Sequence, residues 1–373
     1  MKILFLQNKG KSYGGVWQVN KIVGEALIKE GYDVRVVSIR ENHNDIVVEH
    51  DPRMVVETIN SKDNWETYSY REIVKSIFKV KTFYKKLKSR LKNDISLKKD
   101  VKALHKYIYD YKPDYIVTSH YQLIDMIPKD YLSKTFHEQH LAFRDSWAHK
   151  ATRKTLLKYK DKVTYIWLCK TTYEAALKHG LENSCYIYNA VRFESEKIAD
   201  VNKNKKLITI VRLAEEKRID LMVEIVSEIF KDSKYDDWVL EIYGDGPTKK
   251  IVEQKIKNPR IKLMGKTDNP KEKLLTASIN LNTSSYEGFS LSILEANECG
   301  VPTVTLDFGE SVEEEVINNK TGIIALNKDD YINKLSNLMN DASSLKKMSL
   351  ECKKYNLDFR IENIVKEWQK IFK

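Results

Sequence analysis

The sequence lacks the features that mark secreted, zinc-binding and membrane-spanning proteins. It has four cysteines among 373 residues, and no two of them form a C-x-x-C pair. Neither a disulfide framework nor a structural zinc site is expected, which fits the reducing cytosol. The apolar N-terminal run, residues 1–8, is far shorter than the roughly 18 residues that span a bilayer, and it lacks a small-residue cleavage site. These absences predict a cytoplasmic protein.

What the chain has is a globular composition with an excess of positive charge. Its residues are 42% hydrophobic and 31% charged, too apolar for a disordered chain and too polar for an integral membrane protein. There are 64 lysines and arginines against 53 acidic residues, a formal net charge of +11. Such an excess indicates nucleic acid, an anionic membrane surface or phosphate-bearing ligands, and net charge alone does not choose among them.

Apolar runs and glycines follow the order that is typical of α/β domains. A strand-like run at residues 3–6 precedes a glycine loop, a helical pattern and a second strand at 34–39. The second half repeats this order, with strands at 207–211 and 238–243 around a helix at 219–230. The alternation indicates parallel sheets covered by helices. At roughly 100–200 residues per domain, the length predicts two such domains.

A polar stretch at residues 192–205 lies between two strand-like runs and indicates the domain boundary. We therefore expect one domain at residues 1–195 and another at 196–356. The last residues, about 357–373, have apolar side chains at i, i+3, i+4 spacing, which predicts an amphipathic closing helix.

Residues 71–92 are unusually basic, with nine lysines and arginines against one acidic residue. Apolar residues recur there at spacings of three and four, which predicts a basic amphipathic helix. Such a helix can bury its apolar stripe on its own sheet or bind an anionic membrane surface, and both interpretations stay open. In the second case the protein would be peripheral on the inner face of the plasma membrane.

The most informative stretch is YEGFSLSILEANECGVP, residues 286–302. Two glutamates, Glu287 and Glu295, are separated by seven residues. If a helix begins between them, Glu287 precedes its positive N-terminus and Glu295 lies about one turn inside. The backbone N–H groups of four residues would then be free to bind an anion such as a diphosphate: Gly288, Phe289, Ser290 and Leu291.

This E-x7-E stretch resembles the signature of the retaining glycosyltransferases of family GT4, which have the GT-B fold. Other segments resemble the same family in the same order: YGGV at 13–16, Asn189 in IYNAV, IVRLAEEK at 210–217, YGDGP at 243–247 and LMG at 263–265. The resemblance covers nearly the whole chain. It implies an α/β protein of GT-B architecture, with two Rossmann-like domains whose parallel sheets face each other across a cleft. The C-terminal helix would pack back on the N-terminal domain.

The resemblance implies a role for each matching residue. Arg212 and Lys217 would neutralise the donor diphosphate as charge develops on the leaving group. Glu287 would meet hydroxyls of the donor sugar, and Glu295 would accept hydrogen bonds from the ribose hydroxyls. The remaining donor-binding positions would be Gly14, Gly15, Gly244 and Gly265, together with residues 288–291.

The N-terminal half resembles the family more loosely. In the family a histidine at a strand end contacts the donor sugar, and His137, after the strand-like run at 134–136, is the catalytic candidate. His120, after a similar run, and Asn189 are held in reserve. The HEQH sequence at 137–140 spaces its histidines by three rather than by the four that a zinc protease needs, so no metal site is predicted.

Departures from the family pattern also carry information. Arg218 stands where the family usually has a glycine, and residues 307–322 match only with a one-residue gap, so Glu313, Glu314 and Glu315 receive no role. The chain has no Asp-x-Asp, the carboxylate pair that holds a metal-bound diphosphate in the other main glycosyltransferase fold. Because Arg212 and Lys217 can supply the positive charge, we expect transfer without metal or cofactor.

The sequence therefore predicts a metal-independent retaining glycosyltransferase that moves a hexose from a nucleotide sugar, with a UDP-sugar as the expected donor. The expected acceptor is a cell-envelope glycan, teichoic acid or lipid-linked intermediate. Two alternatives stay open: a non-catalytic partner subunit of a glycosyltransferase complex, and a UDP-sugar epimerase of similar fold. Nucleic acid is not expected as a partner, because the lysines at 71–92 accompany an apolar stripe rather than aromatic platforms.

Overall fold

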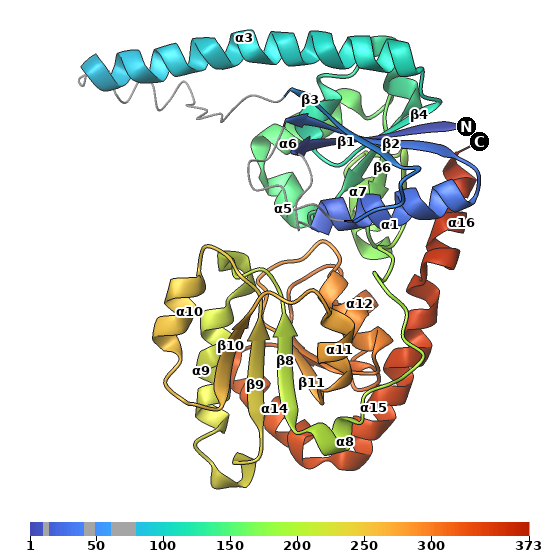
Figure 1. Ribbon diagram of the computed structural model, residues 1–373. Coiled ribbons are helices and arrows are strands. Elements are labelled where there is room, and N and C mark those ends of the chain that lie inside the picture. Colours follow the sequence, from blue (N-terminus) through green and yellow to red (C-terminus); the bar gives the residue numbers. More distant parts are fainter. Residues whose placement is uncertain (10–14, 41–48, 61–79, 373) are drawn as a thin grey trace. The chain divides into compact units, whose positions relative to one another are not determined.

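A computed structural model describes residues 1–9, 15–40, 49–60 and 80–372 (Figure 1). The chain forms two compact units that alternate along the sequence. Unit 1 comprises 1–139, 150–166 and 181–183, and unit 2 comprises 140–149, 167–180 and 184–373. Two short segments of the N-terminal half thus belong to the unit that contains the C-terminal half. The division into domains at residues 195 and 196 stays a prediction.

The N-terminal half of the chain builds a seven-stranded sheet of order β3-β2-β1-β4-β5-β6-β7. The pairs β1–β2, β1–β4, β2–β3 and β4–β5 are parallel. The run Ile3 to Leu6 in β1 is almost fully buried, as expected for a parallel strand covered on both faces. The strands are β1 (Lys2–Lys9), β2 (Asp33–Arg40), β3 (Val55–Asn60), β4 (Tyr115–Thr118), β5 (Thr135–Gln139), β6 (Thr164–Trp167) and β7 (Ser184–Tyr186).

The helices described in this half lie between the strands in the sequence. They are α1 (Gly15–Lys29), α3 (Val80–Tyr111), α4 (Tyr121–Ile124), the short 3-10 helix η1 (Lys129–Lys134), α5 (Phe143–Ala148), α6 (Lys150–Tyr159) and α7 (Lys170–Lys178). Residues 80–92 of the predicted basic helix lie in α3, which continues well beyond the predicted end to Tyr111. Residues 71–79 and Gly14 lie outside the described part of the chain.

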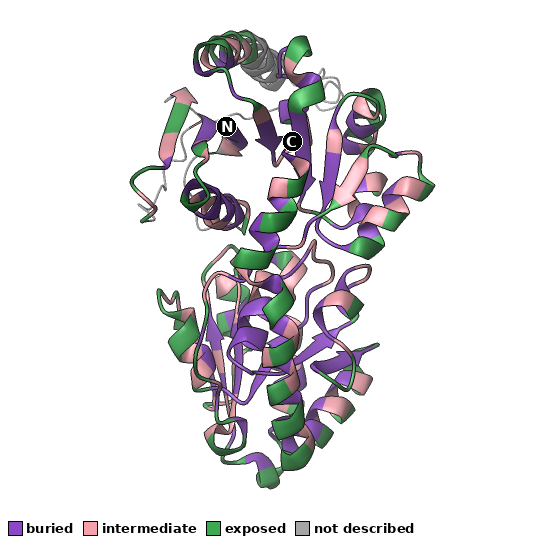
Figure 2. Ribbon diagram, turned by 90° about the vertical axis from the view of Figure 1, so that its right-hand side faces the viewer, coloured by how far each residue is buried: buried purple, intermediate pink, exposed green. Residues whose placement is uncertain are grey.

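The C-terminal half builds a six-stranded parallel sheet of order β10-β9-β8-β11-β12-β13. Its strands are β8 (Lys206–Ile210), β9 (Val239–Tyr243), β10 (Ile261–Gly265), β11 (Ile279–Asn282), β12 (Thr303–Leu306) and β13 (Gly322–Ala325). Figure 2 shows these strands as buried and the outer faces of the surrounding helices as exposed. Helix α9 contributes Met222, Val223 and Val226 to the core, which agrees with its amphipathic sequence.

The helices of this half are α8 (Val201–Asn204), α9 (Ile219–Ile229), α10 (Lys249–Lys255), α11 (Pro270–Leu275), α12 (Leu291–Glu298), α13 (Val312–Glu315), α14 (Lys328–Asn340), α15 (Ala342–Tyr355) and α16 (Ile361–Ile371). Three 3-10 helices complete it: η2 (Glu215–Lys217), η3 (Ser233–Tyr235) and η4 (Asn356–Phe359). Helix α16 occupies the predicted closing position and buries Ile364, Val365 and Trp368. Its packing on the N-terminal domain stays a prediction.

Strand order reverses between β8 and β11, which are neighbours in the second sheet although two strands separate them in the sequence. In open α/β sheets, ligands bind outside the carboxyl ends of the strands at such a reversal. The loops after β8 and β11 therefore occupy the favoured position for a ligand.

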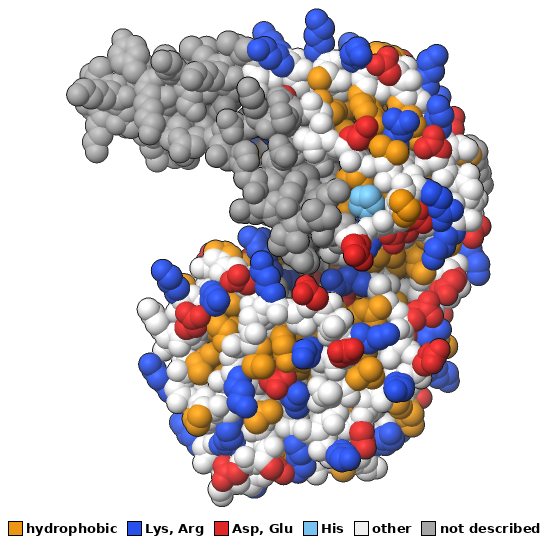
Figure 3. All heavy atoms as spheres, in the orientation of Figure 1, with side chains coloured by type: hydrophobic (Ala, Val, Ile, Leu, Met, Phe, Trp, Pro, Cys, Tyr) orange, Lys and Arg blue, Asp and Glu red, His pale blue; other side chains and the backbone are white. Residues whose placement is uncertain are grey.

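No helix in the described part of the chain combines the length and the apolar character of a membrane-spanning segment. On the face shown in Figure 3, lysine and arginine side chains are interspersed with acidic ones over the described surface and do not gather in one patch.

Candidate functional site

The loops after β8 and β11 are tied together by hydrogen bonds. The Ser285 N–H donates to the Glu216 carbonyl at 2.8 Å, and the Thr283 hydroxyl donates to the Lys217 carbonyl at 2.9 Å. These bonds join IVRLAEEK to the residues just before EGFS, although about 70 positions separate the two segments. Two of the predicted motifs thus form one continuous surface at the strand-order reversal.

An ion pair between Lys217 and Glu287 lies at the centre of this surface. The Lys217 ammonium contacts both carboxylate oxygens of Glu287, at 2.5 and 2.7 Å, and the Ser284 hydroxyl donates to the same carboxylate at 2.7 Å. The two charged side chains are only 18% and 11% exposed. In such a shielded pair, removing one partner leaves an uncompensated charge. The structure therefore brings together two residues that the sequence selected independently.

Arg218 adopts a backbone conformation that favours glycine, with φ at +46°. A left-handed conformation costs a non-glycine residue roughly 1–2 kcal/mol. The Arg218 guanidinium donates to the carbonyl of Thr283 at 2.8 Å and to that of Ser284 at 3.3 Å. The sequence thus departs from the family's glycine at this position for a structural reason. The Arg218 side chain adds further hydrogen bonds between the two loops, and these offset the backbone strain.

Two glycines of the YGDGP turn allow it to support the loop after β8. A Cβ atom on Gly244 would overlap the Val211 carbonyl oxygen, and one on Gly246 would overlap the Leu213 carbonyl oxygen. The Gly244 N–H also donates to the Gly265 carbonyl at 2.8 Å. Only glycine permits this close backbone approach. Gly244 and Gly246 therefore support the loop after β8 by close backbone contact, whereas Gly265 contacts the turn through its carbonyl group.

Arg212 projects from the same loop and is exposed. No ion pair joins its guanidinium to a described residue. Lys217 and Arg212 thus differ: the lysine is paired with Glu287, and the arginine is available to an incoming anion.

The loop that follows Glu287 is held by distant segments of unit 2. A Cβ atom on Gly288 would overlap the carbonyl oxygen of His140, so the two backbones lie in close contact. The Asn189 side-chain amide donates to the Phe289 carbonyl at 3.0 Å, and Asn189 is buried. The reserve candidate Asn189 therefore orients the backbone of this loop.

Glu315 holds the next residue of the loop. Its carboxyl accepts the Ser290 N–H at 2.7 Å and the Ser311 hydroxyl at 2.8 Å. Burial, followed by the nearby charge of Glu287, raises the pKa of Glu315 to about 8. The expectation that all N–H groups from Gly288 to Leu291 are free is therefore wrong for Ser290, because a side chain 25 residues further along the chain occupies it.

Glu310 and Glu314 likewise accept backbone N–H groups at the N-termini of two other helices of unit 2. The Glu310 carboxylate accepts the Arg144 N–H at 3.1 Å, in the first turn of α5. The Glu314 carboxylate accepts the N–H groups of Lys170 and Thr171, at 3.0 and 2.7 Å, in the first turn of α7. Negative charge is favourable at a helix N-terminus. The segment that the sequence left without a role thus caps α5, α7 and α12.

Glu295, the second glutamate of the motif, is almost fully buried in α12 and forms a two-pronged ion pair with Arg192. The Arg192 Nη2 donates to one carboxylate oxygen at 2.7 Å, and its Nε contacts the other. Burial lowers the pKa of Arg192, and Glu295 outweighs this effect, so the pKa is raised. The sequence patterns did not point to Arg192. The recognition of the ribose hydroxyls by Glu295 stays a prediction.

The histidine candidates lie in unit 1. His137, in β5, is fully buried, with ring nitrogens 2.9 Å from the Thr118 hydroxyl and 3.0 Å from the Gln139 amide oxygen. His120 follows β4 and stacks on Tyr121, and burial lowers its pKa. The buried Nδ1 of His120 has no hydrogen-bond partner among the described residues. Gly15 begins α1 in the same unit.

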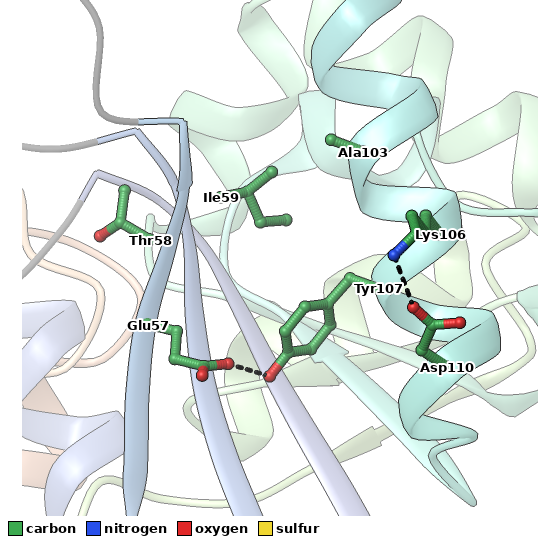
Figure 4. Close-up of a pocket in the computed structure, with 7 residues that line it drawn as sticks. All are labelled: Glu57, Thr58, Ile59, Ala103, Lys106, Tyr107 and Asp110. Carbon is green, nitrogen blue, oxygen red and sulfur yellow. Dashed lines mark hydrogen bonds and ion pairs between the residues drawn. The ribbon is translucent and has the colours of Figure 1, made fainter.

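A cavity of about 480 Å³ lies between β3 and α3 in unit 1 (Figure 4). Its polar groups are paired with one another: the Tyr107 hydroxyl donates to Glu57 at 2.5 Å, and Lys106 contacts Asp110 at 3.2 Å. None of the predicted site residues lines this cavity. We therefore place the candidate site at the strand-order reversal of unit 2. No group of three or more potential metal ligands occurs among the described residues.

Comparisons with known proteins agree with this location. Residues 191–356 match the sequence profile of the family described as glycosyl transferases group 1. The chain is 25% identical over 249 residues to a poly(ribitol-phosphate) alpha-N-acetylglucosaminyltransferase of Staphylococcus aureus, covering 62% of this chain and 48% of that one. It is 28% identical over 169 residues to a poly(glycerol-phosphate) alpha-glucosyltransferase of Bacillus subtilis, covering 44% and 25%. The chain thus spans half or less of the length of these relatives.

The fold also occurs in a solved structure. A variant of Staphylococcus aureus TarM, crystallised with fondaparinux, alpha-GlcNAc-glycerol and UDP, superposes with a TM-score of 0.78 at 16% identity over the full length of both chains. Likeness at this identity concerns the fold. It confirms the predicted α/β class and GT-B architecture.

Proposed function

Residues 191–356 belong to the glycosyl transferases group 1 family, and from this premise we propose that the chain is a retaining glycosyltransferase. The observation that carries the proposal is the Lys217–Glu287 pair, which lies at the strand-order reversal of the unit that contains the family match. The donor is a nucleotide-activated hexose. A partner subunit that had lost activity would have no need to keep this shielded pair.

The donor diphosphate binds between the exposed guanidinium of Arg212 and the ammonium of Lys217. Positive charge placed where the leaving phosphate develops negative charge is usually the largest contribution to such catalysis. Lys217 shifts from Glu287 toward the diphosphate as the donor enters, and the carboxylate of Glu287 is then available to hydroxyls of the sugar. Glu287 is not a covalent nucleophile in this scheme. The acceptor hydroxyl attacks the anomeric carbon from the face that the diphosphate leaves, its proton passes to an oxygen of the departing diphosphate, and the configuration is retained.

A UDP-sugar is the proposed donor, and no metal is required. The presence of UDP in the crystallised TarM variant supports uridine, and two cations in one loop supply the charge that a metal would otherwise provide. His137 is the proposed sugar-contacting group of the N-terminal half, with His120 in reserve.

The proposed acceptor is an anionic polymer of the cell envelope, such as a teichoic acid. Two similar proteins are named for transfer to poly(ribitol-phosphate) and poly(glycerol-phosphate), and the net charge of +11 favours a polyanion. Segment 71–92, of which residues 80–92 are helical, would bind anionic lipid on the inner face of the membrane.

The first test is thermal stabilisation by UDP, GDP, ADP, UDP-glucose, UDP-galactose and UDP-N-acetylglucosamine, each with and without EDTA. A ligand at 100 times its dissociation constant adds about 2.7 kcal/mol to stability. Stabilisation by UDP and one UDP-sugar that survives EDTA is expected. Loss of the effect with EDTA would refute metal independence, and no effect from any nucleotide would refute the transferase proposal.

Product analysis then separates the enzyme from an epimerase. The protein is incubated with the stabilising UDP-sugar, with and without poly(ribitol-phosphate) or poly(glycerol-phosphate). We expect UDP release that depends on the polymer, with sugar incorporated as the α-anomer. Conversion of one UDP-sugar into another without UDP release would instead identify an epimerase.

A further inference from the structure

The loop that carries Glu287 is anchored at its far end by a carboxyl to which the sequence assigned no role. Glu315 is the last residue of α13 and is fully buried. Its side chain accepts the Ser290 N–H, and its backbone carbonyl accepts the Asn297 side-chain amide at 3.3 Å. Residue 315 therefore contacts α12 at its N-cap and again two turns further on.

We propose that Glu315 is a positioning residue of the candidate donor site, whose buried carboxyl holds Ser290 and thereby places Glu287 at the N-terminus of α12. Only two residues separate Glu287 from Ser290, and both are constrained, Gly288 by the His140 carbonyl and Phe289 by Asn189. A displacement of Ser290 is therefore transmitted to the Glu287 carboxylate and its partner Lys217. The inference rests on the proposed function, because it concerns the donor of that reaction.

The electrostatic surroundings give Glu315 a second effect on the donor. Glu287 and Lys217 act on its charge from the loops. Cys169, just before α7, and Tyr355, at the end of α15, also interact with it electrostatically, and Glu314 precedes it in α13. Burial and Glu287 raise the pKa of Glu315 to about 8. At neutral pH the carboxyl is protonated and still accepts the Ser290 N–H. Above pH 8 it becomes ionised and repels a diphosphate at the same helix terminus.

The proposal is tested with Glu315→Gln and Glu315→Met, and with Glu313→Gln as the matched control. Glutamine keeps an uncharged oxygen for the Ser290 N–H, methionine removes it, and Glu313 is exposed on the same short helix. Calorimetry with UDP between pH 6.5 and 9 gives the dissociation constants. We expect Glu315→Met to weaken UDP binding about tenfold or more, as for a lost buried hydrogen bond. Glu315→Gln is expected to stay within about threefold of the wild type at pH 7, by the same reasoning.

The pH profile separates positioning from mere structural support. Wild type and Glu313→Gln lose UDP affinity as the pH rises through 8, whereas Glu315→Gln does not, because its side chain cannot ionise. Equal UDP affinity in wild type and Glu315→Met, or the same pH profile in wild type and Glu315→Gln, would overturn the proposal.

Amide hydrogen exchange without ligand keeps the two proposals distinguishable. The segment 288–294 is expected to exchange faster in Glu315→Met than in Glu315→Gln or Glu313→Gln, because only methionine leaves Ser290 unpartnered. If wild type binds no nucleotide but this difference is found, the proposed function fails and the anchoring by Glu315 stands. If wild type binds UDP and the difference is absent, only the inference about Glu315 fails.

Discussion

The candidate residues of the two units are held by different kinds of interaction. In unit 2, the two motif glutamates are paired with cations, Glu287 with Lys217 and Glu295 with Arg192. In unit 1, His137 is bonded to the neutral side chains of Thr118 and Gln139. Removing one partner of a shielded ion pair leaves an uncompensated charge, whereas removing one partner of a neutral hydrogen bond leaves only an unsatisfied polar group. The comparison therefore predicts that the contacts of the candidate residues cost more to break in unit 2 than in unit 1.

The largest effect is expected from Lys217→Ala, which removes the central charge of unit 2. Transfer should fall by about 100-fold, because stabilisation of a developing charge commonly contributes a few kcal/mol. Turnover with the UDP-sugar found by thermal stabilisation is the measurement. Lys231→Ala, an exposed lysine paired with Glu228, is the control for loss of a lysine elsewhere in unit 2. Normal turnover in a folded Lys217→Ala protein would remove Lys217 from the site.

The next largest effect is expected from Gly244, whose backbone packs against the loop after β8. Gly244→Ala should lower the free energy of unfolding by about 3 kcal/mol or more, because the new methyl group overlaps the Val211 carbonyl and forces backbone shifts. Gly265→Ala is the matched control, since Gly265 also has a positive φ of +77° but nothing lies within 4 Å of its Cβ position. It should cost about 1 kcal/mol. Urea denaturation compares the two, and equal losses would contradict the close approach.

The difference between charged and neutral contacts can be measured with Arg192→Gln and Thr118→Val. Arg192→Gln leaves Glu295 buried without its cation and should cost about 3 kcal/mol of stability. Thr118→Val removes one neutral hydrogen bond to His137 and should cost about 1 kcal/mol. Both values come from urea denaturation at pH 7. A Thr118→Val cost equal to or larger than that of Arg192→Gln would break the comparison between the units.

The smallest effect is a pH dependence in unit 1. The folded-state pKa of His120 is lowered by burial, so the folded protein binds a proton there less readily than the unfolded chain does. His120 therefore contributes stability that is present above its ordinary pKa of about 6.5 and is lost as the pH falls. Between pH 7 and 5, the free energy of unfolding should decrease more in wild type than in His120→Gln. Parallel profiles would show that His120 is freely hydrated.

Most of the fold was predictable because strands and helices carry local patterns. The predicted strands at 34–39 and 238–243 and the helix at 219–230 lie within one residue of β2, β9 and α9 at each end. The extension of α3 to Tyr111 was not predicted, because the predicted helix was defined by its basic run, which ends at Lys92.

The residues of the candidate site also differ in whether the sequence could predict them. Lys217 and Glu287 were predicted because they stand in contiguous motifs at strand and helix ends. Arg192 and Glu315 were missed because their contacts join positions 103 and 25 residues apart, and no periodicity records such a pairing. Arg218 was noticed only as a departure from a glycine, since its compensating bonds reach carbonyls 65 and 66 residues away.

The sequence by itself determined the α/β class, the strand-loop-helix order and the identity of the central lysine and glutamate. These depend on side-chain periodicity and on residues that are close along the chain. Only the tertiary structure decided three contacts. Lys217 forms an ion pair with Glu287, and Arg192 binds both carboxylate oxygens of Glu295. The Glu315 carboxyl accepts a hydrogen bond from the Ser290 N–H. Strand order sets these pairings, because the reversal between β8 and β11 brings distant loops to one edge, and burial then fixes which charges are satisfied.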